Sequence, residues 1–247
     1  MQTNRNVIQL LHRGYESVID LIYPHTCPIC ECIVDKKGKV CKECEQKLKY
    51  IVSPFCMVCG KSLTDEDTEL CFDCIKKKHS FDRGVAAFSY SNALRKSMYN
   101  FKYNNRRENA AFYADAIYRT KGHIIKSWDA QVFIPVPIHK KRMKKRGYNQ
   151  AELIANELSQ MTHIPVDSDI LMRVVNTTPQ KELNDKERAK NLKNAFQVRK
   201  TIVQYKKIVL VDDIYTTGAT LDACAKALKE AGAEKIYFVA ACIGTGF

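Results

Sequence analysis

Short apolar runs and amphipathic stretches follow one another through the last two thirds of the chain. Apolar runs bounded by polar or turn-forming residues predict strands over residues 84–90, 131–137, 169–175, 206–213 and 234–243. Between them, apolar residues at helical spacing predict helices over 93–119, with a break around 104–109, and over 151–161 and 221–232. Strands that alternate with helices predict an α/β fold with a parallel sheet and right-handed crossovers.

Two segments lie outside this alternation. Residues 176–195 are polar and have no periodicity, which predicts a long loop or lid. Near the start, apolar residues from Asn6 to Tyr23 recur at helical spacing before Pro24, which predicts an amphipathic helix. Its polar face is not strongly basic, so packing on the protein is favoured over binding to a membrane surface.

A different pattern dominates the region between these parts, where nine of the eleven cysteines lie. Eight of them form four C-x2-C pairs, and the second two pairs repeat the first two at offsets of 29 or 30 residues; the pairs are Cys27/Cys30, Cys41/Cys44, Cys56/Cys59 and Cys71/Cys74. Two thiolates separated by two residues can face one ion, and two such turns complete a tetrahedron around Zn²⁺. The spacing therefore predicts two structural four-cysteine zinc sites.

Other uses of these cysteines are less favoured. An iron–sulfur cluster or a redox dithiol fits a fourfold repeat of small turns less well than structural zinc does. The spacing leaves open whether the pairs are used in sequence or interleaved. Cys32 could exchange with a ligand of the first site, whereas His25 and His79 lie outside the spacing. Cys224 and Cys242 are expected in the core.

Composition limits the class of protein. The chain has 247 residues, of which 45% are hydrophobic and 27% charged, and no apolar run approaches 18 residues. Charged residues interrupt the N-terminal segment, so it lacks the apolar core of a secretion signal, and we expect a cytoplasmic protein with reduced cysteines. The net charge of +13 and the pI of about 9.2 favour polyanionic partners: nucleic acid, an anionic membrane or phosphorylated small molecules.

The most informative stretch is residues 208–228, which read as a buried strand, two acids, a Thr- and Gly-containing loop and a helix. Backbone N–H groups and hydroxyls of a loop that precedes a helix can surround a phosphate; the candidates are Thr216, Thr217, Gly218, Ala219 and Thr220. Asp212 and Asp213 end the strand, where open α/β sheets bind ligands, and paired carboxylates there suit sugar hydroxyls with Mg²⁺ nearby. The glycine-rich motifs typical of ATPases and dinucleotide enzymes are absent from the sequence.

This stretch resembles the 5-phosphoribosyl 1-pyrophosphate (PRPP) loop of type I phosphoribosyltransferases. The resemblance implies that Asp212 and Asp213 hold the ribose in the catalytic centre, that residues 216–220 bind the 5′-phosphate, and that Mg²⁺ accompanies the pyrophosphate. In that family a loop after the first core strand touches the pyrophosphate. Here that loop is residues 131–150, and one or two of its basic side chains, Arg142 and Arg146 foremost, are expected to do so. Residues 176–195 have the place of the family's lid, with Gln180, Arg188 and Asn191 as candidates.

A duplicated cysteine ribbon joined to such a domain resembles the ComF family of competence-associated proteins. The resemblance rests on C-P-I-C (27–30), K-Y-x3-R (102–107), P-V-P-I-H (135–139), R-G-Y-N-Q-A-E-L (146–153), Q-x2-L-x4-R-x2-N (180–191) and V-D-D-I-Y-T-T-G-A-T (211–220). It implies an N-terminal helix (1–24), a double zinc ribbon (25–79) and a phosphoribosyltransferase-like domain (80–247). Glu31 and Cys32 depart from it, because the family commonly has Gly after the second cysteine.

Three functions remain open on the sequence alone. Family members are linked to uptake of single-stranded DNA with a helicase-like ATPase partner, and the basic, aromatic stretch 98–109 suits nucleic acid, although its aromatic residues also suit core packing. An active phosphoribosyltransferase would pass the phosphoribosyl group of PRPP to an unknown, nucleobase-like acceptor. Alternatively, PRPP is a bound regulator and the domain a switch.

Overall fold

The computed structural model describes residues 24–35, 39–175, 195–199 and 204–244. The predicted N-terminal helix, apart from its end at Pro24, lies outside the described residues. So does the predicted lid up to residue 194, with its candidates Gln180, Arg188 and Asn191. These interpretations therefore stay predictions.

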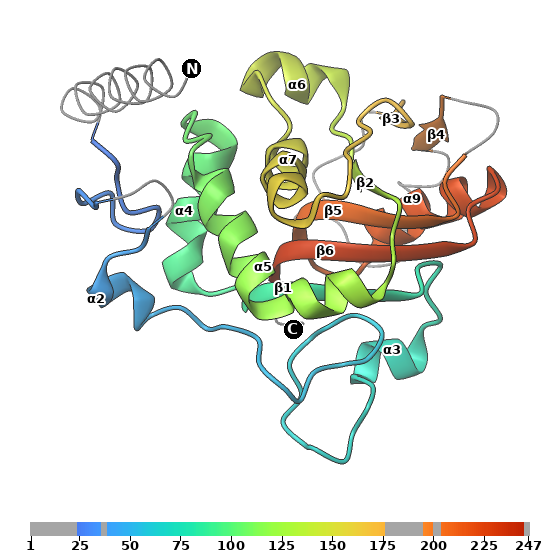
Figure 1. Cartoon of the computed structure of the whole chain (residues 1–247), viewed down its shortest axis with the longest axis horizontal. Helices are drawn as coiled ribbons and strands as arrows, with labels where there is room; N and C mark the ends of the chain where they lie inside the picture. Colours follow the sequence, from blue (N-terminus) through green and yellow to red (C-terminus); the bar gives the residue numbers. More distant parts are fainter. Residues whose placement is uncertain (1–23, 36–38, 176–194, 200–203, 245–247) are drawn as a thin grey trace, which may run out of the picture.

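A parallel four-stranded sheet forms the centre of the described chain (Figure 1). Its strands are β1 (Arg83–Ser89), β2 (Val132–Pro135), β5 (Lys207–Tyr215) and β6 (Lys235–Ile243), in the order β1-β6-β5-β2. Outside β2, Val166 adds a parallel bridge to Phe133. Two short strands, β3 (Leu171–Arg173) and β4 (Phe196–Val198), pair antiparallel in a separate hairpin. The predicted parallel α/β fold is confirmed.

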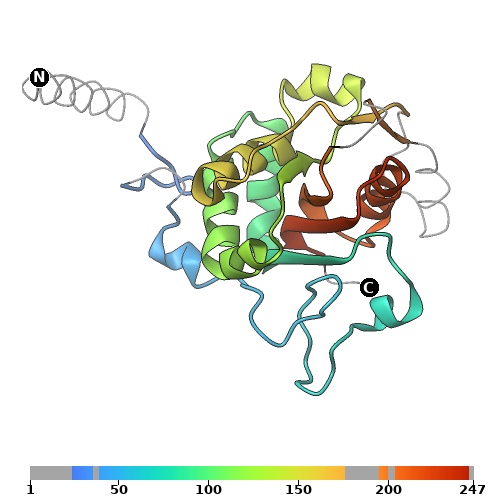
Figure 2. The ribbon, with the colours of Figure 1, turned by 45° about the vertical axis from the view of Figure 1, so that its right-hand side comes forward.

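Helices cover both faces of the sheet because the central strands are apolar on both sides. Along β5, Val209 and Val211 belong to the apolar cluster of α5 (Asn109–Ser127) and α7 (Gln150–Thr162), whereas Ile208 and Leu210 belong to that of α9 (Ala219–Glu230). The turned view shows α5 and α7 on one side of the strands and α9 on the other (Figure 2). The helix α4 (Asn92–Tyr103) packs beside α5. None of the helices in the described part of the chain has the length and apolarity needed to span a bilayer.

The cysteine-rich region, which contains the short helices α2 (Lys42–Glu45) and α3 (Phe72–Lys76), runs along the outer edge of β1. Ile51 N–H donates to the Ala87 carbonyl at 2.8 Å, and Gly84 N–H donates to the Val58 carbonyl at 2.7 Å. These bonds satisfy backbone groups that an edge strand otherwise leaves exposed. At the closest approach, a side chain on Gly60 would come within 2.7 Å of the Gly84 carbonyl oxygen, so this turn requires glycine.

The basic stretch expected as a loop is instead a helix, α6 (Lys140–Arg146). Lys and Arg are good helix formers, and this helix carries too few apolar residues to show a period. The side chain of His139 accepts a hydrogen bond from Lys141 N–H at its start, and Gly147, with φ of 77°, ends it. The prediction of a loop for residues 140–146 is therefore wrong. The stretch does follow β2, as expected.

Candidate functional site

The topology places a crevice between the carboxyl ends of β2 and β5. After β2 the chain passes through α7 to Val166, which pairs with the outer edge of β2. After β5 it passes through α9 to β6, which lies on the side of β5 away from β2. The two crossovers diverge, so the neighbouring strands β2 and β5 flank a topological switch point. Open α/β sheets bind ligands at such points.

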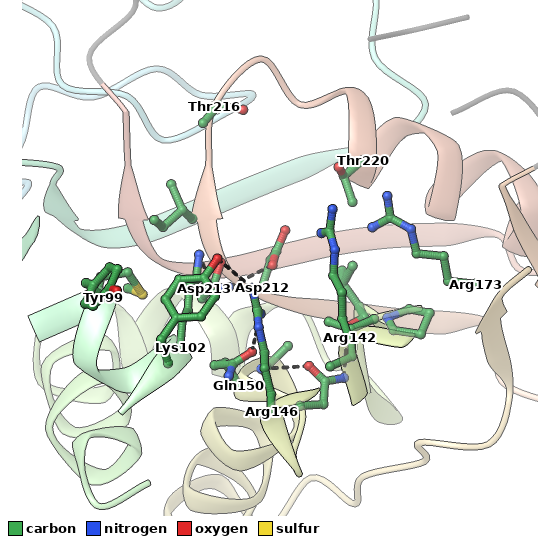
Figure 3. Close-up of a pocket in the computed structure, with 18 of the residues that line it drawn as sticks. Tyr99, Lys102, Arg142, Arg146, Gln150, Arg173, Asp212, Asp213, Thr216 and Thr220 are labelled. Atoms are coloured by element: carbon green, nitrogen blue, oxygen red, sulfur yellow. Dashed lines mark hydrogen bonds and ion pairs between the residues drawn. The ribbon is translucent and has the colours of Figure 1, made fainter. Parts of the chain in front are cut away.

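A pocket of about 500 Å³ lies at this point (Figure 3). Its walls come from the end of β5, from α4 and from the segment that joins β2 to α7. Two carboxylates and six cationic side chains line it: Asp212, Asp213, Arg95, Lys102, Arg142, Lys145, Arg146 and Arg173. The excess of positive charge suits a ligand with several negative charges.

The two carboxylates have different surroundings. The Lys102 ammonium donates to Asp213 at 2.8 Å, and Figure 3 shows this pair reaching from α4 to β5. The carboxylate of Asp212 accepts a hydrogen bond from Asp213 N–H at 2.8 Å. Burial, and then the neighbouring charge of Asp213, raise the pKa of Asp212 to about 7. One acid is thus neutralised by a cation, while the other titrates near neutral pH.

The TTGAT loop (residues 216–220) borders the pocket through its two end threonines. Thr216 and Thr220 line the cavity, and Thr220 already belongs to the first turn of α9. Gly218 has φ of 75° and caps the start of α9. Thr217 and Ala219, which the sequence also nominated, do not line the pocket with side chains. The structure therefore places a helix N-terminus and two hydroxyls beside the paired carboxylates.

Half of the basic residues in 140–146 face this cavity. Arg142, Lys145 and Arg146 line it, while Lys140, Lys141 and Lys144 do not. Opposite them Arg173 reaches in from β3, and Figure 3 shows its guanidinium close to that of Arg142. Burial, and then the neighbouring charge of Arg142, lower the pKa of Arg173. Two guanidiniums held this close together favour binding of an anion between them.

The R-G-Y-N-Q sequence (146–150) fixes the position of this basic wall. Tyr148 donates its hydroxyl hydrogen to the Phe101 carbonyl at 2.6 Å, and Asn149 Nδ2 donates to the Val136 carbonyl at 3.0 Å. Gln150 Oε1 accepts from the Arg146 guanidinium at 2.9 Å. These bonds tie the turn between α6 and α7 to α4 and to the end of β2, so Arg146 is held toward the pocket.

An aromatic pair forms the wall on α4. The rings of Tyr99 and Tyr103 lie 5.0 Å apart and are 57% and 51% exposed. The Arg146 guanidinium lies 4.8 Å from the Tyr103 ring centre and donates to its hydroxyl at 3.1 Å. Tyr99 and Tyr103 are one helical turn apart on the face that carries Lys102, so the pair stands beside the carboxylates. Phe101, from the same basic, aromatic stretch, is buried in the core.

The cysteine pairs are used in sequence. Cys27, Cys30, Cys41 and Cys44 form one group, Cys56, Cys59, Cys71 and Cys74 form the other, and the four sulfurs of each group lie within 4.8 Å of one another. A tetrahedral site with Zn–S bonds of about 2.3 Å has sulfur–sulfur separations of about 3.8 Å. The Cys30–Cys41 and Cys59–Cys71 separations of 3.7 and 3.6 Å fit this geometry. Both groups are therefore suited to Zn²⁺, which would hold the turns together.

Residues near the cysteine groups have other contacts. Cys32 is exposed and outside the four-sulfur group, and Cys224 and Cys242 are buried as expected. His79 pairs with Asp222 on α9. Glu31 has φ of 69°, a region that favours glycine, and its carboxylate accepts from Lys96 at 2.9 Å and from Arg106 at 3.2 Å. The left-handed backbone at Glu31 is a conformation that glycine adopts more readily than glutamate does.

Sequence reasoning did not nominate Lys102, Gln150 or Arg173 as site residues. Lys102 and Gln150 occur in the K-Y-x3-R and R-G-Y-N-Q motifs, so the motifs were a usable signal. Arg173 lies in a short strand without a motif, and only the placement of the β3–β4 hairpin brings it to the pocket.

Comparison with known proteins finds matches for both the cysteine-rich region and the sheet domain. The model of the double zinc ribbon domain matches residues 18–75, and that of the phosphoribosyl transferase domain matches residues 144–244. Competence protein F of Haemophilus influenzae is 35% identical over 207 residues, which cover 81% of this chain and 88% of the relative. Competence protein ComFC of Bacillus subtilis is 29% identical over 78% of this chain and 79% of its own length.

Two further similarities extend this set. DNA utilization protein YhgH of Escherichia coli K12 is 28% identical over 82% of this chain and 89% of its own length. Among solved structures, a purine phosphoribosyltransferase from Pyrococcus horikoshii has 15% identity and a TM-score of 0.34, and covers 53% of this chain and 74% of its own. The relatives and the two domain models confirm the resemblance on which the sequence analysis relied.

Proposed function

The chain belongs to the Competence protein F (ComF) family, and on this premise we propose that its pocket binds PRPP with Mg²⁺ in support of DNA uptake during natural transformation. The observation that carries the proposal is one cavity that joins paired carboxylates, a helix N-terminus with two threonines and a basic wall. PRPP offers a matching set of groups: two ribose hydroxyls, a 5′-phosphate and a pyrophosphate.

Each group of the ligand has a partner of suitable chemistry. The carboxylates of Asp212 and Asp213 accept hydrogen bonds from the ribose hydroxyls, and Thr216 and Thr220 donate to the 5′-phosphate at the start of α9. Arg142 and Arg173 meet the pyrophosphate. Because Lys102 already pairs with Asp213, it can move to a phosphate oxygen when the ribose arrives.

Oxygen donors at the end of β5 fit Mg²⁺, which prefers carboxylates combined with substrate phosphates. When bound, the ion would neutralise charge on the pyrophosphate as it leaves. In an active enzyme, a nucleophilic nitrogen of the acceptor forms a bond to C1 of the ribose while the C1–O bond to pyrophosphate breaks. Asp212 and Asp213, close to the cationic transition state, then stabilise it electrostatically.

Calorimetric titration of the zinc-loaded protein with PRPP and Mg²⁺ tests the binding site. We expect saturable binding that is lost in Asp212→Asn/Asp213→Asn. The matched control is Asp115→Asn, which alters an exposed ion pair with Arg119 on α5. Absence of binding to the wild type, or equal binding to the double variant, would refute the proposal.

The exposed Tyr99–Tyr103 pair favours a second role at the same pocket, binding of a base. An aromatic base can stack on a tyrosine while Arg95, Lys145 and Arg146 attract phosphates, so the wall suits either a free acceptor base or a single DNA strand. The name of the YhgH relatives, DNA utilization protein, is consistent with a strand.

Fluorescence anisotropy with a labelled single-stranded oligonucleotide tests this role. We expect Tyr99→Ala/Tyr103→Ala to weaken binding, and the affinity of the wild type to fall with salt at a slope of about −0.7 per phosphate contact. A Tyr118→Ala variant on α5 is the control. Release of pyrophosphate from PRPP, dependent on an added nucleobase, would identify transfer, whereas competition between PRPP and DNA without release would identify a regulator.

A further inference from the structure

The back of the TTGAT loop rests on the second zinc ribbon. Tyr215, directly before the loop, belongs to the apolar cluster that contains Cys56, Cys59 and Cys71. Tyr215 is buried within this cluster, with 3% of its surface exposed. The loop therefore lies between the pocket on one side and the ribbon on the other.

The chain that leaves the ribbon then clasps α9. Asp222, in the first turn of α9, accepts hydrogen bonds from Lys77 at 2.6 Å, from His79 Nδ1 at 3.0 Å and from Ser80 N–H at 2.9 Å. The side chain of His79 is only 2% exposed. Burial alone would raise the pKa of Asp222, yet these partners hold it below its usual value. The clasp is thus a largely buried contact between the ribbon and the loop's helix, in which Asp222 accepts three hydrogen bonds and His79 Nε2 has no hydrogen-bond partner.

Aromatic stacking links the clasp to Tyr215. The His79 ring stacks on Phe81 at 4.5 Å, Phe81 meets the Phe238 ring edge-on, and Phe238 stacks on Tyr215 at 5.1 Å. Above them, a side chain on Gly218 would come within 2.8 Å of the Tyr215 hydroxyl and 3.1 Å of His79 Cε1. The backbone of the loop at Gly218 therefore packs directly against the side chains of Tyr215 and His79, which the ribbon positions.

We propose that His79, Asp222 and Tyr215 are positioning residues through which the second zinc ribbon holds the TTGAT loop in its ligand-binding conformation. Ligand binding at the pocket and retention of zinc by the second group of cysteines then reinforce each other; that group is Cys56, Cys59, Cys71 and Cys74. The ligand half of this coupling rests on the proposed function. Coupling between two binding sites is reciprocal, so each ligand must strengthen binding of the other by the same factor.

A ligand-independent measurement tests the seating of the loop. Hydrogen exchange followed by mass spectrometry should show amides 216–222 exchanging about tenfold faster in His79→Ala than in the wild type, within the roughly 5–150-fold range typical of coupled sites. The matched control Asp115→Asn should leave this segment unchanged. Because His79→Ala could unfold the ribbon, bound zinc is counted in the same samples, and Tyr215→Phe, which keeps the stacked ring, serves as a milder variant. Unchanged exchange in a zinc-loaded His79→Ala protein overturns the proposal.

The reciprocal arm uses the wild type, with the first zinc site as internal control. Cysteine alkylation in the presence of a chelator is followed peptide by peptide, with and without PRPP and Mg²⁺. We expect PRPP to slow alkylation of Cys56, Cys59, Cys71 and Cys74 by about tenfold relative to Cys27, Cys30, Cys41 and Cys44. Equal effects on both groups, in a protein that binds PRPP, overturn the coupling. If calorimetry shows no PRPP binding, the proposed function fails, and hydrogen exchange alone decides on the seating of the loop.

Discussion

Replacing Asp212 by asparagine should stabilise the protein at alkaline pH, although it removes a residue of the proposed site. The carboxyl holds its proton until about pH 7 in the folded chain, because burial and the charge of Asp213 oppose ionisation. In the unfolded chain it ionises near 3.8. Between these values the native state binds more protons than the unfolded state, so stability falls as pH rises, and the loss is complete above pH 7.

The magnitude follows from the size of the shift. A rise from 3.8 to about 7 is about 3 units, and at 1.36 kcal/mol per unit it sets an upper limit of ~4 kcal/mol. Solvent reaches Asp212 through the pocket and screens the charges, so we expect about half of this. Asparagine is neutral, nearly isosteric, and retains an oxygen that can accept the hydrogen bond from Asp213 N–H.

Urea unfolding of both proteins at pH 5, 6.5 and 8, with zinc present, measures the difference. Asp212→Asn should exceed the wild type by about 1 kcal/mol at pH 5 and by about 2 kcal/mol at pH 8, because the wild type has lost only part of this stability by pH 5. Effects of pH on the zinc sites are common to both proteins and cancel in the difference. A difference that does not change with pH, or a variant less stable at pH 8, would refute the reasoning.

Three further changes test other parts of the structure. Arg173→Ala should weaken PRPP binding about 10- to 100-fold, the value of a charge-assisted hydrogen bond to phosphate, while Arg119→Ala on α5 should have no effect in the same titration. Cys59→Ser should lower bound zinc from two ions to one by metal analysis, whereas Cys32→Ser should retain both, since its thiol lies outside the four-sulfur groups. Glu31→Gly should change the free energy of unfolding by less than about 1 kcal/mol. Glycine relieves the strain of the left-handed backbone at this position, and this offsets the loss of two exposed ion pairs. A larger loss of stability would show that the ion pairs dominate.

The sequence predicted the parts of the fold that depend on local pattern. Each strand of the parallel sheet is a short apolar run, and the cysteine spacing and the acid pair before T-T-G-A-T are local signals, so all were visible. The helical state of residues 140–146 was missed because it depends on the caps at His139 and Gly147 rather than on periodicity. Sequential use of the cysteine pairs was not decidable from spacing, since both arrangements need the same turns.

Contacts between distant segments could not be predicted in this way. Lys102 reaches Asp213 across 111 positions, and Arg173 enters the pocket from the β3–β4 hairpin. Likewise, His79 was considered only as a possible zinc ligand, whereas its partner, Asp222, lies 143 residues away. A side chain's partner at such separation depends on topology, which periodicity within one segment does not specify.

The two ribbons act on different walls of the pocket. Glu31, in the first ribbon, is bound by Lys96 and Arg106 and so holds α4, the helix that carries Tyr99 and Lys102. In the second, the His79–Asp222 clasp holds the start of α9 and with it the TTGAT loop. The duplicated motif thus contacts both the aromatic wall and the wall proposed for phosphate, and losing either ion should disturb one half of the pocket. Each ribbon shares an apolar cluster with the sheet domain, and zinc bound at the two four-sulfur groups would give each wall a fixed support.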